Sequence, residues 1–310
     1  MDSDPINPPE QDAPDEAAVE LDAARPSAGG GLAPGLYLVA TPIGNARDIT
    51  LRALDVLAAA DVLAAEDTRT ARRLLEIHGV RRGGRGLVAY HDHNGATVRP
   101  RLLAALAEGR SVALVSDAGT PLVADPGYRL AAEARAAGHA VTAVPGASAL
   151  LAALSVAGLP TDRFLFAGFL PPKQAARRRA LAALAAVPAT LVFYESPRRS
   201  AECLADMAEV LGSARDGALC RELTKRFEEV RRGTLGALAA AYATEPEPRG
   251  EVVLLAGPPV EEAPSGETLD AALEAALEGR TVRDAAAEVA AALGLPRREV
   301  YARALALGRR

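Results

Sequence analysis

Residues 111–121 read SVALVSDAGTP. The first five are mostly apolar and include two valines, which is typical of a short buried strand. The next six contain Ser, Asp, Gly and Pro, the residue types that favour turns. In open α/β sheets, turns of this kind follow the carboxyl ends of strands, where ligands bind.

Further short apolar runs alternate with helical patterns on both sides of this strand. We expect strands at 36–41, 61–65, 87–90, 111–116 and 140–144. We expect helices from about residue 50, at 68–77, near 98–108 and near 126–137. Thr50 suits an N-cap, and Asp125 is expected to cap a helix whose first residue is Pro126. This alternation predicts a largely parallel sheet covered by helices, the α/β fold class.

The chain of 310 residues is long enough for about two such domains. A second series of strands is expected at 163–168, 190–194, 218–221 and 251–256, in a sheet of mixed topology, after a Gly-Leu-Pro hinge at 158–160. We therefore predict a disordered acidic tail and linker at 1–34, an N-terminal α/β domain at 35–146 and a C-terminal α/β domain at 147–258. An Ala-rich helical module of helix-turn-helix shape is expected at 265–310.

Charge and cysteine content narrow the class of protein. Residues 1–33 hold eight acidic residues and one basic residue, so the rest of the chain carries a net charge of +2 although the whole carries −5. The mildly basic remainder permits binding to nucleic acid. Two cysteines make no disulfide framework, and no apolar run is long enough for a membrane span. Without a signal-peptide pattern as well, the sequence predicts a soluble cytoplasmic protein.

Similar turns follow other predicted strands. They read TPIGN at 41–45, SDAGTP at 116–121, PGASA at 145–149, FYESP at 193–197 and RELTK at 221–225. The first lacks the GxGxxG pattern of dinucleotide sites, and taken alone it equally fits a tight turn. In the third, Ser148 equally fits a helix cap. Together the turns predict a ligand cleft between two domains.

Several of these motifs occur in the same order in a known family. They are TPIGN (41–45) with DITLRAL (48–54), AEDTR (65–69), SDAGTP (116–121), GLPTDRF (158–164), YESP (194–197), and RELTK (221–225) with FEE (227–229). In these motifs the chain, from about Leu36 to its end, resembles the class III, tetrapyrrole-methylase-like methyltransferases. Within them it is similar to the group that methylates small-subunit ribosomal RNA.

The resemblance implies two α/β domains of tetrapyrrole methylase type that bind S-adenosylmethionine in the cleft between them, in a homodimer. It also implies 2′-O-methylation of a cytidine at the decoding centre of 16S rRNA. The residues that it implies for the cofactor are Ile43, Asp117, Thr120, Ser148, Ala149 and Tyr194. The chain departs from the pattern at Gly95, where relatives usually carry an acid.

A ribose hydroxyl is a poor nucleophile, so a base, or a cation that stabilises the developing alkoxide, assists its methylation. We expect Lys225 to be the cation and Glu222 or Glu66 to accept the proton. The alternative is that Glu66, Arg69, Glu222 and Lys225 pair as salt bridges. His91 and His93 flank Asp92, but a third ligand at suitable spacing is missing, so we expect no metal.

Dispersed arginines are the expected contacts to RNA. They are Arg69, Arg177, Arg178, Arg221, Arg297 and Arg298. Arg297 and Arg298 begin a basic helix that suits phosphate contact. Charge runs such as residues 177–179 also commonly do no more than solvate a helix face.

Two rival functions stay open at the level of the sequence. One is a methyltransferase of a tetrapyrrole precursor, which would not need the C-terminal helical module. The other is a non-catalytic, ribosome-associated RNA-binding protein, against which the turns at Gly44, Asp117, Gly119 and Gly146 argue.

Overall fold

The computed structural model describes residues 31–246, 249–259, 266–293 and 295–307. Most of the predicted acidic tail, residues 1–30, lies outside the described residues. The chain divides into two compact units, unit 1 at residues 1–151 and unit 2 at residues 152–310.

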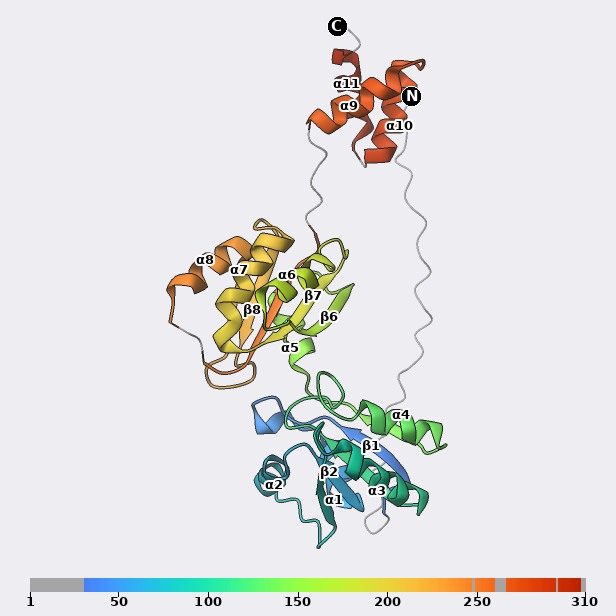
Figure 1. Ribbon diagram of the computed structural model, residues 1–310, viewed down its shortest axis with the longest axis vertical. Coiled ribbons are helices and arrows are strands. Elements are labelled where there is room, and N and C mark those ends of the chain that lie inside the picture. The colour runs from blue at the N-terminus through green and yellow to red at the C-terminus, as the bar shows by residue number, and fades with distance from the viewer. Residues whose placement is uncertain (1–30, 247–248, 260–265, 294, 308–310) are drawn as a thin grey trace, which may run out of the picture. The chain divides into compact units, whose positions relative to one another are not determined.

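Unit 1 is a parallel sheet with helices on both faces (Figure 1). Its strands are β1 (Gly35–Val39), β2 (Val62–Ala65), β3 (Gly86–Ala89), β4 (Ser111–Val115) and β5 (Val141–Val144). The order across the sheet is β3-β2-β4-β1-β5, and the paired strands run parallel. The helices are η1 (Ala46–Asp48), α1 (Leu51–Ala59), α2 (Thr68–Ile77), α3 (Gly95–Ala107) and α4 (Tyr128–Ala136). The predicted parallel α/β sheet is confirmed.

Each face of this sheet has its own apolar core. On one face, Val56 and Leu57 of α1 and Leu75 of α2 pack against alternate strand residues such as Leu63. On the other face, side chains of α3 and α4 pack against the remaining strand residues. Burial on both faces explains why the strands are continuous apolar runs rather than alternating patterns.

The start of α4 differs from the prediction. The helix begins at Tyr128, and Gly127 is its N-cap with no side-chain hydrogen bond, so the expected cap by Asp125 and the expected first residue Pro126 are wrong. Gly127 has φ of +128°, and a Cβ there would lie 2.7 Å from Cδ2 of Leu114 on β4. The backbone at residue 127 therefore lies so close to the sheet that only glycine fits there. This contact determines where α4 begins. The Thr50 cap of α1 is confirmed, because its side chain accepts a hydrogen bond from the Ala53 amide.

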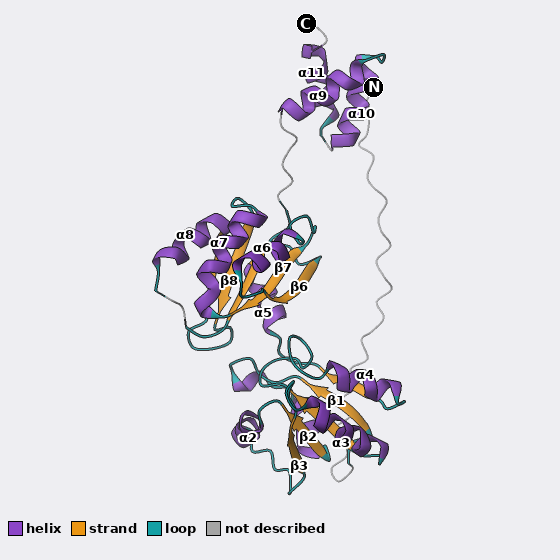
Figure 2. Cartoon of the chain, viewed as in Figure 1, coloured by secondary structure: helices purple, strands orange, loops and turns teal. Residues whose placement is uncertain are grey.

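Unit 2 contains a mixed sheet in the order β6-β7-β10-β8-β9 (Figure 2). The strands are β6 (Phe164–Phe169), β7 (Thr190–Glu195), β8 (Asp216–Arg221), β9 (Glu229–Thr234) and β10 (Val252–Ala256). β6 and β7 are parallel, and the other pairs are antiparallel. Sequence reasoning missed β9, because it ends the described sheet and carries Arg231 and Arg232 in place of an apolar run.

Helices of unit 2 bury the apolar core of this sheet. They are α6 (Gln174–Ala182), α7 (Ser200–Leu211) and α8 (Leu235–Thr244), with the short η2 (Pro197–Arg199) before α7; α5 (Ala149–Ala157) spans the boundary between the units. Leu181, Met207 and Leu238 come from these helices and share one core with Phe193 and Leu254 of the strands.

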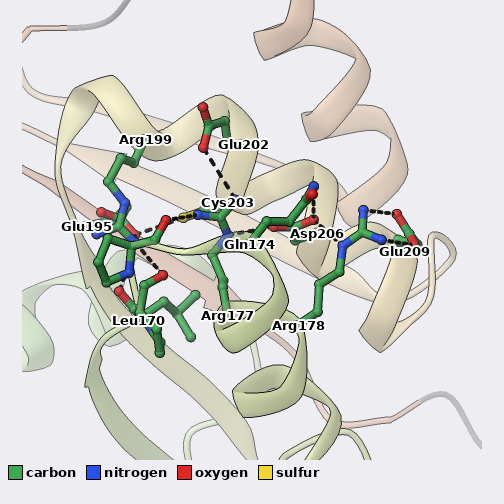
Figure 3. Close-up of polar contacts among 12 residues, drawn as sticks. Leu170, Gln174, Arg177, Arg178, Glu195, Arg199, Glu202, Cys203, Asp206 and Glu209 are labelled. Carbon is green, nitrogen blue, oxygen red and sulfur yellow. Dashed lines mark hydrogen bonds and ion pairs between the residues drawn. The ribbon is translucent and has the colours of Figure 1, made fainter.

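A buried ion-pair network joins α6 to α7 (Figure 3). The Arg177 side chain is 1% exposed, and its Nε donates to Oδ2 of Asp206, also 1% exposed, at 2.6 Å. Arg178 donates to the other Asp206 oxygen at 2.7 Å and pairs with Glu209. Burial alone would raise the pKa of Asp206, but the hydrogen bonds from Arg178 and Arg177 outweigh it and lower that pKa. The expectation that Arg177 contacts RNA is wrong, because its guanidinium lies inside unit 2.

Beyond β10, α9 (Gly266–Leu277), α10 (Val282–Leu293) and α11 (Arg297–Leu307) pack around a small core of their own. Leu273, Val289 and Val300 each contribute one side chain to it from a different helix. The sequence pattern predicted this helical segment. None of the helices in the described part of the chain is long and apolar enough to cross a membrane.

The buried network gives a stability prediction. Arg177→Ala should lower the free energy of unfolding by roughly 3 kcal/mol, because it leaves a buried carboxylate without its fully buried partner. Arg179→Ala, an exposed neighbour on the same helix, is the matched control and should change stability by about 0.5 kcal/mol or less. Urea unfolding of the full chain measures both. Equal losses in the two variants would contradict the assignment of Arg177 to the core.

Candidate functional site

The strands of unit 1 all end at one edge of the sheet, here called the carboxyl edge. Because the paired strands are parallel, the loops after β1, β2, β3, β4 and β5 emerge there together. The sequence motifs TPIGN, EDTR, HDHN, SDAGTP and PGAS lie in these loops. The structure therefore brings together motifs that are up to about a hundred residues apart in the sequence.

Backbone hydrogen bonds join the loops after β1 and β4. The Thr41 amide donates to the Gly119 carbonyl at 2.8 Å, and the Gly119 amide donates to the Thr41 carbonyl at 3.0 Å. The Thr41 hydroxyl also donates to the Ser116 carbonyl at 3.3 Å. The Thr120 hydroxyl reaches the Ala147 carbonyl, in the loop after β5, at 3.1 Å. Thr120 thus holds two loops together.

Small residues keep these loops close to one another. Gly119 has φ of +80°, and a Cβ there would lie 3.4 Å from Cγ2 of Ile43, whose side chain is buried. A Cβ at Gly146 would lie 2.9 Å from the Cβ of Ala40, closer than side-chain carbons approach. Ser148 and Ala149 follow immediately, at the start of α5. The loops after β1, β4 and β5 therefore form a compact backbone surface at the carboxyl edge.

The loops after β2 and β4 both carry acidic residues of this edge. Asp117 is exposed, and its Oδ1 accepts a hydrogen bond from the Asp67 amide at 3.0 Å. Asp67 caps α2 and pairs with Arg69, whose side chain is 86% exposed. Burial raises the pKa of Glu66, and the carboxylate of Asp117 raises it further. Glu66 therefore holds a proton more readily than an ordinary glutamate.

Asp125 belongs to this group, although its sequence context suggested only a helix cap. Burial raises the pKa of Asp125 to about 6 against the effect of a hydrogen bond with Ser116, and the carboxylates of Glu66, Asp117 and Asp92 contribute to the rise. The sequence Asp-Pro-Gly is compatible with a helix cap and also with a partly buried acid. The sequence alone therefore could not indicate which of these two roles Asp125 has. Asp117 lies in the same loop as Asp125, after β4, whereas Glu66 and Asp92 come from the loops after β2 and β3.

In unit 2, Lys225 lies between two carboxylates. Its Nζ donates to Oε1 of Glu222 and to Oε2 of Glu251, each at 2.8 Å. Desolvation opposes the charge, but these hydrogen bonds outweigh it and raise the pKa of Lys225. The same contacts lower the pKa of Glu222, also against desolvation. For this pair the salt-bridge alternative is confirmed.

The backbone beside Lys225 is strained. Glu222 and Thr224 have φ of 51° and 66°, in the left-handed region that non-glycine residues rarely adopt. A Cβ at Gly250 would overlap the Glu222 side chain. Such strain persists where surrounding contacts hold it, and it is common at functional sites.

The remaining predicted site residues lie in the units as follows. Tyr194, at the end of β7, makes edge-on contacts with the rings of Phe166 and Phe169. Arg221 pairs with Glu229 at 2.8 Å. Arg297 and Arg298 are exposed at the start of α11. Within the described ranges, no group of three His, Cys, Asp or Glu side chains is placed to hold a metal ion.

Comparison with known proteins identifies relatives over most of the chain. Residues 35–239 match the family described as Tetrapyrrole (Corrin/Porphyrin) Methylases, and residues 262–308 match the RsmI C-terminal HTH domain. A protein of Mesorhizobium japonicum named ribosomal RNA small subunit methyltransferase I is 54% identical over 89% of this chain and 93% of its own length. A Pseudomonas aeruginosa protein of the same name is 46% identical, over 87% and 96%.

Solved structures show the same fold. Uroporphyrin-III-C-methyltransferase of Thermus thermophilus matches 72% of this chain and 94% of its own with a TM-score of 0.52 and 27% identity. Diphthine synthase matches 72% and 89% with a TM-score of 0.56 and 19% identity.

The raised pKa of Asp125 gives a pH prediction. An acid whose folded pKa lies above its ordinary value of 3.8 stabilises the fold fully below pH 4, and this contribution is lost as the pH rises through about 6. Asp125→Asn should remove this loss and raise the free energy of unfolding at pH 7.5 by about 1 to 2 kcal/mol, with allowance for partial exposure. Urea unfolding at pH 4 and 7.5 measures it. A variant whose gain over the wild type is the same at both pH values would contradict the assignment.

Proposed function

Because this chain belongs to the ribosomal RNA small subunit methyltransferase I group of the S-adenosylmethionine-dependent tetrapyrrole methylases, we propose that it methylates the ribose 2′-hydroxyl of a cytidine in 16S rRNA. The proposed target lies at the decoding centre of the small ribosomal subunit. We propose further that the protein acts in the cytoplasm as a homodimer.

One observation supports an RNA substrate above others. The chain carries both the methylase region and the C-terminal helical domain, and it is about half identical to relatives named for small-subunit rRNA over most of their length. The solved tetrapyrrole methylase of similar fold is far more distant, at 27% identity. Methylation of a tetrapyrrole precursor and a purely non-catalytic role are therefore less well supported.

The carboxyl edge of unit 1 fits the adenosyl cofactor. Gly146 leaves no room for a side chain beside Ala40, and the positive φ of Gly119 disfavours one, so backbone amides and carbonyls contribute to that surface. Such a surface suits a flat base and a ribose at the end of a parallel sheet. We propose that Ile43, Asp117, Thr120, Ser148 and Ala149 hold the cofactor. Tyr194 stays a prediction as a contact from unit 2.

When bound, S-adenosylmethionine supplies a methyl group attached to a positively charged sulfur. The residues of the chain then align the hydroxyl and remove its proton. The bound cofactor would supply the methyl group from its sulfur to the 2′-oxygen, and the hydroxyl proton would pass to a carboxylate of the chain. Glu66 suits this role better than Glu222, because the pKa of Glu66 is raised and that of Glu222 is lowered.

Lys225 is the proposed cation. Its raised pKa keeps the ammonium group charged at neutral pH, so it can stabilise a developing alkoxide but cannot act as the base. Arg69, Arg178, Arg221, Arg297 and Arg298 remain proposed contacts to RNA. Arg178 also pairs with Asp206 of the buried network, and Arg297 and Arg298 are exposed at the start of α11.

The first experiment identifies the product. The full chain, supplied with labelled S-adenosylmethionine, should transfer the label to small ribosomal subunits that lack the modification and not to uroporphyrinogen. Nucleoside mass spectrometry should then find 2′-O-methylcytidine. Label in a tetrapyrrole but not in rRNA would favour the tetrapyrrole methyltransferase over the rRNA methyltransferase. Binding of RNA without any methyl transfer would favour the non-catalytic role.

The second experiment tests Lys225. Lys225→Ala should lower kcat by about a hundredfold or more, because the alkoxide loses its stabilising charge, while calorimetry finds unchanged binding of S-adenosylmethionine. The matched control is Lys173→Ala, which removes the chain's other lysine and should keep full turnover. Turnover near that of the wild type in Lys225→Ala would leave Lys225 a structural partner of Glu222 and Glu251.

A further inference from the structure

A cavity of about 410 Å³ lies in unit 1 beside the starts of α3 and α4. It is here called the α3–α4 cavity, and its polar lining comprises His91, Asp92, Arg99, Asp125, Tyr128 and Arg129. Thr41, Gly119 and Ala147, which form the proposed cofactor surface, are not in its lining. Its volume lies in the range that small ligands occupy.

We propose that the α3–α4 cavity binds one nucleotide of the RNA substrate, with its phosphate beside Arg129 and its base against Tyr128. This inference rests on the proposed function, because it takes RNA as the substrate. The nucleotide is distinguished from a simple anion by three features of the lining, namely an exposed cation, an exposed ring and carboxylate acceptors.

The phosphate side of the cavity has positive charge that is not neutralised. Arg129 is exposed, and within the described residues the structure shows it no hydrogen bond or ion pair. Arg99, by contrast, is held by Glu133 at 2.8 Å and is not available as a free charge. Arg129 is therefore the cation of this cavity that is available to bind a phosphate.

The N-termini of two helices add positive electrostatic potential at the cavity. Gly95 and Ala96 of α3, and Gly127 and Tyr128 at the start of α4, line the cavity. Neither helix has a side-chain cap: the Asn94 side chain instead donates to the Ala89 carbonyl and accepts from the His91 amide, and the cap of α4 is Gly127. The first amides of both helices are thus left without side-chain acceptors, which favours an anion nearby.

The base side of the cavity is aromatic. Tyr128, the first residue of α4, is 73% exposed. An exposed ring at the edge of a cavity is a platform on which a base can stack, and such stacking tolerates any base. Single-stranded RNA is commonly recognised by stacking of this kind.

The acidic residues of the lining repel a simple anion, but they can accept hydrogen bonds from the edge of a base. Asp92 and Asp125 carry oxygens that accept hydrogen bonds, for example from the exocyclic amino group of cytosine or from a ribose hydroxyl. Nδ1 of His91 is buried and has no hydrogen-bond partner in the part of the chain that the structure describes. A ligand with donors at one end and a phosphate at the other satisfies both sides of the cavity.

The test uses the full chain and two readouts. The first is steady-state methylation of small ribosomal subunits, and the second is binding of a fluorescent single-stranded oligocytidine of twelve nucleotides. Tyr128→Ala and Arg129→Ala should each raise the KM for subunits and the Kd for the oligonucleotide at least fivefold, with kcat within threefold of the wild type. Binding of S-adenosylmethionine should be unchanged. Tyr128→Phe, which keeps the ring, should behave as the wild type.

Arg101→Ala is the matched control, since Arg101 is an exposed arginine of α3 outside the cavity lining. KM and Kd values in Tyr128→Ala and Arg129→Ala within twofold of this control would overturn the proposal. If the wild type binds S-adenosylmethionine but methylates no subunits, the proposed function fails by itself. Oligonucleotide binding then tests the cavity proposal independently. Weaker binding in Tyr128→Ala and Arg129→Ala but not in the control supports the proposal, and unchanged binding in both variants overturns it.

Discussion

The common direction of the paired strands in unit 1 is the constraint on which its binding edge depends. Parallel pairing places the carboxyl ends of β1, β2, β3, β4 and β5 at one edge, so loops distant in the sequence meet there. The reciprocal hydrogen bonds of Thr41 and Gly119 then join two of these loops. A larger residue at 146 would displace Ala40, and one at 119 would be strained by its left-handed φ, so glycine at both positions permits the close approach. A reversed strand would move its loop to the opposite edge.

Ion pairing decides which of the charged residues can act on a ligand. Arg177 and Asp206 satisfy one another in the core, so they hold α6 against α7 and are withdrawn from the surface. Lys225 is also paired, but at a partly exposed position on a strained loop, so its charge is fixed in place rather than buried. Arg129 lies on the surface beside a cavity, and among the described residues the structure shows it no ion-pair partner. Three cations of similar chemistry thus have different roles.

The strands could be predicted because their burial on both faces leaves continuous apolar runs, as in residues 111–115 and 252–256. Prediction failed where local chemistry was ambiguous. The arginines of β9 conceal a strand at the end of the sheet, and the start of α4 depends on contact between Gly127 and Leu114 rather than on Asp-Pro-Gly itself. Asp125 acquires its high pKa largely from burial, with contributions from Glu66 and Asp92 of other loops, and no local pattern contains these causes.

The sequence by itself determined the α/β class, the order of the elements and the turn motifs that identify the family, because these depend on the spacing of residues near one another in the chain. Only the tertiary structure decided which acids share a site and which arginines are buried. Arg177 and Asp206 are 29 residues apart, and Asp67 and Asp117 are 50 apart. The energy of a charge depends on its neighbours in space and on its access to water, and both are set only when the chain has folded.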